Sequence, residues 1–207
     1  YIPIDVQAYK KKEFRVEVVK FDKTTVDLPV LQANEYEFEY NEPYRPVYHF
    51  SPKLGWTNDP NGMYYLDGEY HLAYQANPYG TRHFNMHWGN AVSKDLMHWK
   101  DLPFIIAPDK LGAIFSGSAV VDADNCSGFG KNAVVAMYTS AGRGIQQQSI
   151  AYSTDKGRTY TKYEGNPVIK GEGRQPNFRD PKMIRIGDKW VVAIAAGDLI
   201  AVYSSSD

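Results

Sequence analysis

The chain has 207 residues, enough for one large domain. Its 23 basic and 24 acidic residues give a net charge of −1, which argues against nucleic acid or an anionic membrane as the main partner. The one cysteine, Cys126, excludes an internal disulfide and a thiolate metal cluster, and no apolar run is long enough to span a membrane. Aromatic residues reach 14%, which suits either carbohydrate binding or tyrosine-rich strands.

Residues 1 to 45 differ from the rest of the chain. They contain a basic run, Lys10 to Lys12, and an alternating stretch, EYEFEY, from Glu35 to Tyr40. Alternation indicates half-buried strands, and the lysine run is typical of a solvated surface. We expect an appended β element or the end of a preceding module here, joined at Pro43 and Pro46 to a second region, residues 46–207.

The rest of the sequence predicts strands rather than helices, because its apolar runs are short, rich in β-branched and aromatic residues, and separated by turn residues. Asp-Gly favours a type I′ turn in the first of two tight hairpins, and Gly-Asp is expected to act in the same way in the second. A third pair has a longer loop. The three predicted pairs are Met63–Leu66 with Tyr70–Gln75, Lys182–Ile186 with Trp190–Ala196, and Ser118–Val121 with Ala133–Tyr138.

A Ser-x-Asp motif recurs after each hairpin. Its serines are Ser93, Ser153 and Ser205, which are 60 and 52 residues apart. A unit of about four strands that recurs at this period is typical of propeller blades. We therefore predict an all-β fold, an incomplete β-propeller of about two and a half to three blades. Because the third unit stops at its aspartate, we expect a portion of a longer protein.

Two carboxylates occupy similar settings in this repeat. Asp59 lies in WTNDPNG, and Asp180 lies in FRDPK, each just before the strand that opens a unit. Inner strands of a propeller converge on its axis, so we expect both side chains to face one funnel. The proline after each aspartate places these positions at strand starts or bulges. The alternative is that Asp-Pro and Asn-Gly serve only as turns.

Polar and aromatic residues accompany the carboxylates. Arg179 is expected to favour the ionised form of Asp180, unless the two form a plain surface ion pair. Ser116 is a third polar group at the axis, unless a small residue there only lets strands crowd together. Gln75 can both donate to and accept from a sugar hydroxyl. Trp88 is either an aromatic platform for a sugar or part of the blade packing.

His83 and His87 are four residues apart, but no helical pattern surrounds them. No acidic third ligand is spaced for zinc, so the sequence predicts no metal site. We expect no cofactor.

Five motifs in order carry a family resemblance: WTNDPNG, the Tyr-Gln of LAYQANP, HWGNAVSKDLMHW, FSGSAVVD and FRDPK. Together they resemble glycoside hydrolase family 32, the β-fructosidases, which include levanases, inulinases and invertases. The similarity runs from about His49 to Asp207 and leaves residues 1–45 uncovered. It implies a five-bladed β-propeller, usually followed by a β-sandwich.

The resemblance also implies a retaining mechanism. Asp59 matches the family's nucleophile, and Asp180 matches its transition-state stabiliser. The general acid/base is a glutamate in a Trp-Glu-Cys type motif; neither Glu164 nor Glu172 matches it, so we expect this portion to be inactive alone. The positions that match the fructosyl site are Asn58, Asn61, Gln75, Trp88, Phe115, Ser116 and Arg179.

The implied substrate is a fructan or sucrose, with no nucleic acid and no membrane insertion. A polymeric substrate implies a secreted, periplasmic or cell-surface protein, although no signal peptide opens this chain. The sequence leaves open levan against inulin or sucrose, endo against exo cleavage, and the oligomeric state. Two alternatives remain: a fructan-binding or structural module without turnover, and a neighbouring propeller glycosidase family that acts on pentoses.

Overall fold

The computed structural model describes residues 40–171 and 177–207. Contacts divide the chain into two units, Tyr1–Pro43 and Tyr44–Asp207. The β appendage and the lysine run predicted for the N-terminal region lie almost entirely outside the described residues.

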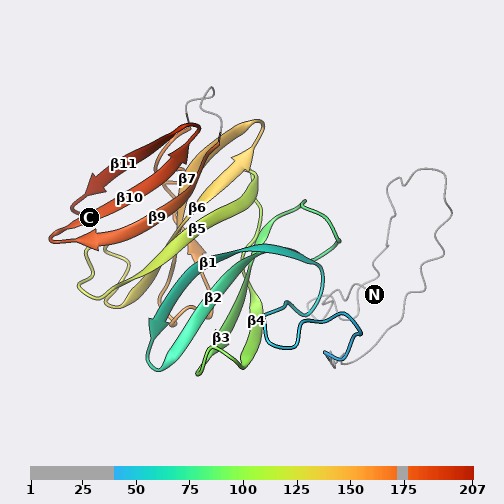
Figure 1. The fold of residues 1–207 in the computed structure, drawn as a ribbon. Coiled ribbons are helices and arrows are strands. Elements are labelled where there is room, and N and C mark those ends of the chain that lie inside the picture. The colour runs from blue at the N-terminus through green and yellow to red at the C-terminus, as the bar shows by residue number, and fades with distance from the viewer. Residues whose placement is uncertain (1–39, 172–176) are drawn as a thin grey trace, which may run out of the picture. The chain divides into compact units, whose positions relative to one another are not determined.

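The described part of the second unit consists of strands in three antiparallel sheets (Figure 1). The first sheet contains β1 (Trp56–Leu66), β2 (Glu69–Asn77), β3 (His87–Ser93) and β4 (Trp99–Ile106). The second contains β5 (Ala113–Asp122), β6 (Ala133–Gly142), β7 (Ile145–Ser153) and β8 (Thr161–Lys162). The third contains β9 (Phe178–Ile186), β10 (Lys189–Ala196) and β11 (Leu199–Ser205). Over the described ranges, no helix is long and apolar enough to cross a membrane.

The three predicted strand pairs are confirmed as β1–β2, β5–β6 and β9–β10. In the first hairpin, Asp67 and Gly68 have φ values of 50° and 85°, as a type I′ turn requires. In the second hairpin only Gly187 has a positive φ, 62°, so the prediction that this turn repeats the first is wrong. Glycine in the first turn position supplies the positive φ there, and Asp188 does not have to adopt it.

The Ser-x-Asp repeat is confirmed as one recurring structure at the end of the third strand of each sheet. The serine Oγ donates to the aspartate Oδ1 at 3.1 Å from Ser93, 2.7 Å from Ser153 and 2.5 Å from Ser205. In each case the aspartate N–H returns a hydrogen bond to the same Oγ. The hydrogen-bonded turn closes the strand and gives the three sheets the same organisation.

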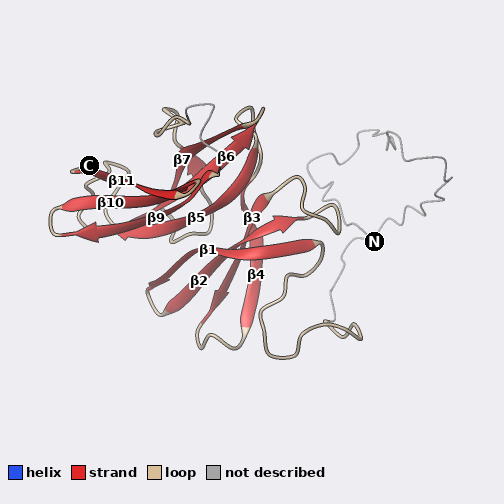
Figure 2. Cartoon of the chain, turned by 45° about the horizontal axis from the view of Figure 1, so that its top comes forward, coloured by secondary structure: helices blue, strands red, loops and turns tan. Residues whose placement is uncertain are grey.

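The three sheets are blades of an incomplete β-propeller. The first strand of each sheet contacts the first strand of the next, β1 with β5 and β5 with β9 (Figures 1 and 2). Alternate residues of β6 explain how the blades stack: Tyr138 packs with Trp88 of the first sheet, and Met137 packs with Phe178 of the third. The middle sheet is therefore buried on both faces, and the inner strands are brought side by side.

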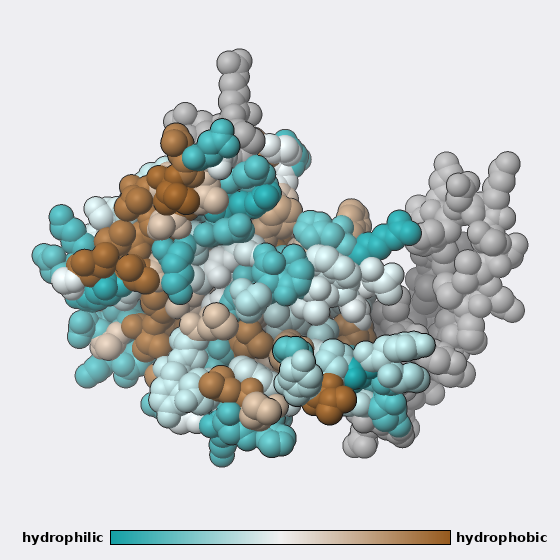
Figure 3. Space-filling view, in the orientation of Figure 1, coloured by the Kyte–Doolittle hydropathy of each residue, from teal (hydrophilic) through white to brown (hydrophobic). Residues whose placement is uncertain are grey.

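The third sheet carries a band of exposed apolar side chains. Figure 3 shows it in brown over β9–β11. The large apolar residues exposed on these strands are Ile184, Ile186, Leu199, Ile200, Val202 and Tyr203. Ile200 and Val202 lie on one face of β11 and Leu199 and Tyr203 on the other, because side chains alternate along a strand.

We predict that the Ser-x-Asp turn stabilises the fold where it is buried. Ser153 is buried and its Oγ also accepts the Gly157 N–H at 2.8 Å, so Ser153→Ala leaves buried groups unpaired. It should lower the free energy of unfolding by about 1–3 kcal/mol. The matched change Ser205→Ala removes the same motif from an exposed position and should cost less than about 0.5 kcal/mol. Chemical denaturation of both variants measures this; equal costs would contradict it.

Candidate active site

Each of the three inner strands is interrupted by a shift in register. The shifts fall between Thr57 and Pro60 in β1, between Ile114 and Gly117 in β5, and in β9 opposite Ala193 to Ala195 of β10. A β-bulge inserts an extra residue and redirects side chains. Asp59, Ser116 and Asp180 therefore lie inside their strands at bulges. The prediction that both aspartates precede a strand is wrong. The sequence analysis also allowed a bulge at these positions, and that is what the structure shows.

The bulges bring Asp59 and Ser116 into direct contact. Ser116 Oγ donates to Asp59 Oδ2 at 2.6 Å, although the two residues come from different sheets. This short bond to a carboxylate is typical of a charge-assisted hydrogen bond. Ser116 is buried whereas Asp59 is exposed, so the bond fixes one oxygen of an accessible carboxylate.

Asp180 lies close enough to Asp59 for their charges to interact. Partial burial raises the pKa of the Asp180 carboxyl; the nearby Arg179 guanidinium opposes this rise, and the negative charge of Asp59 adds to it. Arg179 Nε lies 3.8 Å from Asp180 Oδ2, with 38% and 50% of the two side chains exposed. Arg179 favours the ionised form of Asp180, as expected, but desolvation outweighs this effect and the net pKa of Asp180 is raised.

The predicted amide residues differ in exposure. Asn58 is exposed, whereas Asn61 and Gln75 are each 2% exposed. Asn61 Oδ1 accepts the N–H of Gly117 across the sheets at 3.2 Å. Within the described ranges, neither Asn61 Nδ2 nor Gln75 Nε2 has a hydrogen-bond partner. Buried donors of this kind are costly to leave unpaired.

Trp88 does not form the exposed platform that the sequence suggests. It is completely buried in the core between the first two sheets, and its Nε1 donates to the Phe115 carbonyl at 3.0 Å. The alternative interpretation, that Trp88 is part of the blade packing, is confirmed. Its ring lies in a core cluster with Ile114 and Ala119 of β5.

Three aromatic side chains pack in a row that adjoins Ser116 through Phe115. Phe115, which precedes Ser116, packs edge-on against His83, with ring centroids 5.5 Å apart. His83 in turn packs edge-on against Trp56, at 5.3 Å. Trp56 opens the WTNDPNG motif, and its adjacency to Asn58 and Asp59 was the available indication. In the sequence, His83 stands out only by its spacing from His87, which predicts no metal site.

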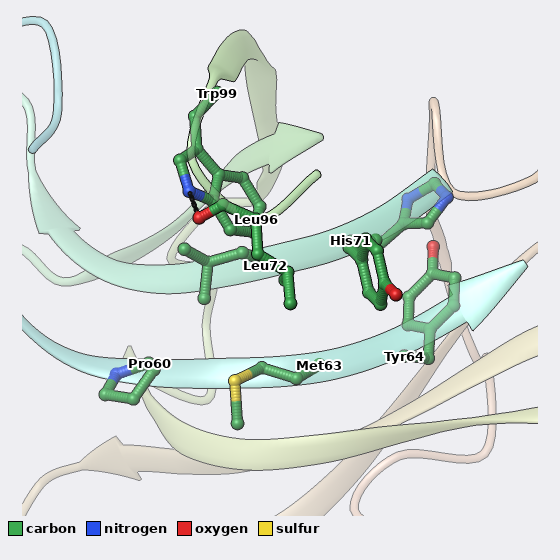
Figure 4. Close-up of a pocket in the computed structure, with 8 residues that line it drawn as sticks. Pro60, Met63, Tyr64, His71, Leu72, Leu96 and Trp99 are labelled. Carbon is green, nitrogen blue, oxygen red and sulfur yellow. Dashed lines mark hydrogen bonds between the residues drawn. The ribbon is translucent and has the colours of Figure 1, made fainter. Parts of the chain in front are cut away.

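A separate apolar hollow of about 410 Å³ lies along β1 and β2 (Figure 4). Its wall includes Met63, Leu72 and Trp99, and the Trp99 ring is fixed by a 3.1 Å hydrogen bond from Nε1 to the Leu96 carbonyl. None of the carboxylates discussed above lines it. Its chemistry does not suit hydrolysis, so the candidate active site remains the group around Asp59, Ser116 and Asp180.

Comparison with known proteins agrees with this geometry. Residues 49–207 match the family described as "Glycosyl hydrolases family 32 N-terminal domain". The chain belongs to glycosyl hydrolase family 32. Among curated family 32 relatives, a levanase of Bacillus subtilis is 57% identical over 173 residues, covering 81% of this chain and 25% of the levanase. An extracellular exo-inulinase of Aspergillus awamori is 42% identical over 209 residues, covering 86% and 39%.

Solved family 32 structures share the fold. The exo-inulinase from Aspergillus awamori has a TM-score of 0.74 at 41% identity, over 82% of this chain and 39% of that one. The fructofuranosidase from Schwanniomyces occidentalis, complexed with fructose, has a TM-score of 0.73 at 40% identity, over 82% and 35%. The chain thus spans less than half the length of these relatives.

The raised pKa of Asp180 generates a prediction about stability. The unfolded chain loses this proton near an ordinary pKa of about 3.9, whereas the folded chain retains it to higher pH. Stability contributed by the protonated carboxyl is therefore present at low pH and is lost as pH rises through this window. Asp180→Asn should raise the unfolding temperature at pH 7 and change it less at pH 3.

Thermal unfolding at both pH values measures this effect. Asp188→Asn is the control, because it removes the same charge from the exposed β9–β10 turn. A lower unfolding temperature for Asp180→Asn at pH 7 than for the unmodified chain would contradict the prediction.

Proposed function

We propose that the protein containing this chain hydrolyses β-fructosidic bonds by a retaining mechanism, with Asp59 as nucleophile and Asp180 as transition-state stabiliser. The observation that carries the proposal is the contact of Ser116 with Asp59 next to Asp180, at three successive bulges. In retaining glycoside hydrolysis a carboxylate nucleophile forms a covalent glycosyl intermediate, which is the role proposed for Asp59. Family membership over residues 49–207 supports the assignment.

In the first step, an Asp59 carboxylate oxygen attacks the anomeric carbon of the fructosyl unit. A C–O bond to the enzyme forms while the glycosidic C–O bond breaks, and the leaving oxygen takes a proton from a general acid. Water then hydrolyses the ester and restores the Asp59 carboxylate. Ser116 fixes Asp59 Oδ2 by its 2.6 Å bond, which orients the carboxylate toward the sugar.

The charge balance between the two aspartates suits this sequence of events. The negative charge of Asp59 contributes to the raised pKa of Asp180. As Asp59 attacks, its negative charge is lost to the new bond while positive charge develops on the sugar ring, and an ionised Asp180 carboxylate would stabilise that charge.

The general acid is not assigned within this chain. Glu164 lies in an exposed position after β8, and Glu172 lies outside the described residues. We propose that a glutamate outside residues 1–207 supplies the proton. The five-bladed propeller expected from the family would place it on a later blade.

The substrate class follows from the relatives. The curated relatives are named levanase, exo-inulinase and invertase, so we propose a fructan or sucrose as the substrate. The amides of Asn61 and Gln75, whose nitrogens have no partner within the described ranges, are of a type suited to sugar hydroxyls. One relative is described as extracellular, and we propose secretion or surface exposure, where a polymer is met.

The nucleophile assignment is tested by Asp59→Asn in the full-length gene product. An amide cannot form the ester intermediate, so release of fructose from levan, inulin and sucrose should fall by about 10³-fold or more. Asp67→Asn, in the exposed turn of the same hairpin, is the matched control and should retain activity. Full activity of Asp59→Asn would refute the assignment.

A second prediction concerns the 207-residue chain by itself. Since no general acid is assigned within it, purified chain should hydrolyse sucrose and levan at a rate near that of a blank. Robust fructose release by the chain alone would show that a general acid lies within residues 1–207, contrary to the proposal. Binding of fructan without hydrolysis by the full-length gene product would favour the non-catalytic alternative.

A further inference from the structure

The backbone at Asp180 has an unusual conformation that requires support. Asp180 has φ = 62°, in the left-handed region, and Pro181 after it has no N–H to donate. Pairing with β10 joins Arg179 to Ala195 and Lys182 to Ala193, so the bulge carries an extra residue. Such a conformation persists only where the surroundings determine it.

Two completely buried side chains of the middle sheet contact this bulge. Thr139 Oγ1 on β6 accepts the Asp180 N–H at 3.1 Å and donates to Gln148 Oε1 on β7 at 2.7 Å. Gln148 Nε2 then donates to the Phe178 carbonyl at 2.9 Å. The chain of three bonds closes a loop that spans Arg179, from the Phe178 carbonyl to the Asp180 N–H.

A third buried side chain contacts the far end of the bulge. Ser118 Oγ on β5 donates to the Pro181 carbonyl at 2.9 Å and accepts the Met183 N–H at 2.8 Å. Four backbone groups around Asp180 are thus paired with side chains of a different sheet. Hydrogen bonds that are fully buried in this way are costly to break, which makes the geometry rigid.

The preceding junction has the same arrangement with different residues. There Trp88 Nε1 donates to the Phe115 carbonyl, and Asn61 Oδ1 accepts the Gly117 N–H. Trp88 pairs with Gln75 across β2 and β3, as Gln148 pairs with Thr139 across β6 and β7. Support of an inner-strand bulge by side chains of the previous sheet is therefore a repeated feature of the fold.

We propose that Thr139, Gln148 and Ser118 are positioning residues that fix the Asp180 carboxylate for the transition state. The inference rests on the proposed function, because it assigns these residues to the role of Asp180 in fructoside hydrolysis. Without the Thr139 hydroxyl, the Asp180 N–H and Gln148 Oε1 lose their partner and the bulge relaxes. A displacement of about 1 Å at a catalytic group can cost about 10²-fold in rate.

The kinetic test uses Thr139→Val, which keeps the shape and removes the hydroxyl, in the full-length gene product. We expect kcat on levan or sucrose to fall by about 10–100-fold while KM changes by less than about threefold, since the lost interaction belongs to the transition state. Thr139→Ser should restore kcat to within about threefold of the unmodified enzyme.

The matched control is Ser140→Ala on the same strand. Ser140 is also buried and bonds Ser149 on β7 at 2.8 Å, so the variant loses a side-chain bond between the same two strands. It should lose thermal stability to a similar extent and keep kcat within about threefold. An equal fall in kcat for Ser140→Ala and Thr139→Val would overturn the inference.

A double-mutant cycle separates positioning from general stability. In an Asp180→Ala background, Thr139→Val should lower the residual kcat by less than about twofold, because no carboxylate remains to be positioned. A loss as large as in the unmodified background would overturn the inference.

Amide hydrogen exchange in the 207-residue chain tests the same contacts without activity. Exchange of the Asp180 N–H should speed up at least tenfold in Thr139→Val and stay within twofold in Ser140→Ala. Unchanged exchange in Thr139→Val would overturn the inference. If the unmodified full-length gene product is inactive but exchange is accelerated in Thr139→Val, the result counts against the proposed function. It would still show that Thr139 supports the bulge.

Discussion

The arrangement of this protein depends on hydrogen bonds that cross from one sheet to the next at the inner-strand bulges. A bulge gives up part of its own ladder, and the freed backbone groups are buried. Trp88, Asn61, Thr139, Gln148 and Ser118 pair these groups from the neighbouring sheet. The bulges are therefore stabilised by the stacking of the sheets. The same stacking fixes the positions of the side chains at the bulges.

The same constraint places negative charges close together. Asp59 and Asp180 come from the first and third sheets; partial burial raises the pKa of Asp180, and the charge of Asp59 adds to the rise. Ser116 moderates this arrangement with a hydrogen bond to Asp59, and Arg179 with its positive charge. A site that concentrates carboxylates lowers the stability of the fold in exchange for chemical reactivity, as is usual where pKa values are shifted for function.

Much of the fold could be predicted from local sequence. Asp67-Gly68 has the backbone that its turn chemistry favours, and the Ser-x-Asp spacing indicates three equivalent strands with the same terminal hydrogen bonds. The burial of Trp88 and the conformation of the second hairpin turn could not be predicted from the sequence in this way. A tryptophan in a polar motif has the same local signature whether its ring packs in a core or faces a sugar, and only the stacking of β3 against β5 decides between them.

The sequence by itself determined the family, the strand pairing and the two aspartates, because these rest on short motifs and their order along the chain. Tertiary structure decided the bulges, the contact of Ser116 with Asp59, and the net rise in the pKa of Asp180. Arg179 is adjacent in sequence and visible there, whereas desolvation and the charge of Asp59 arise only when distant strands pack. The physical reason is that burial and cross-sheet hydrogen bonds are properties of the assembled sheets, which no local pattern encodes.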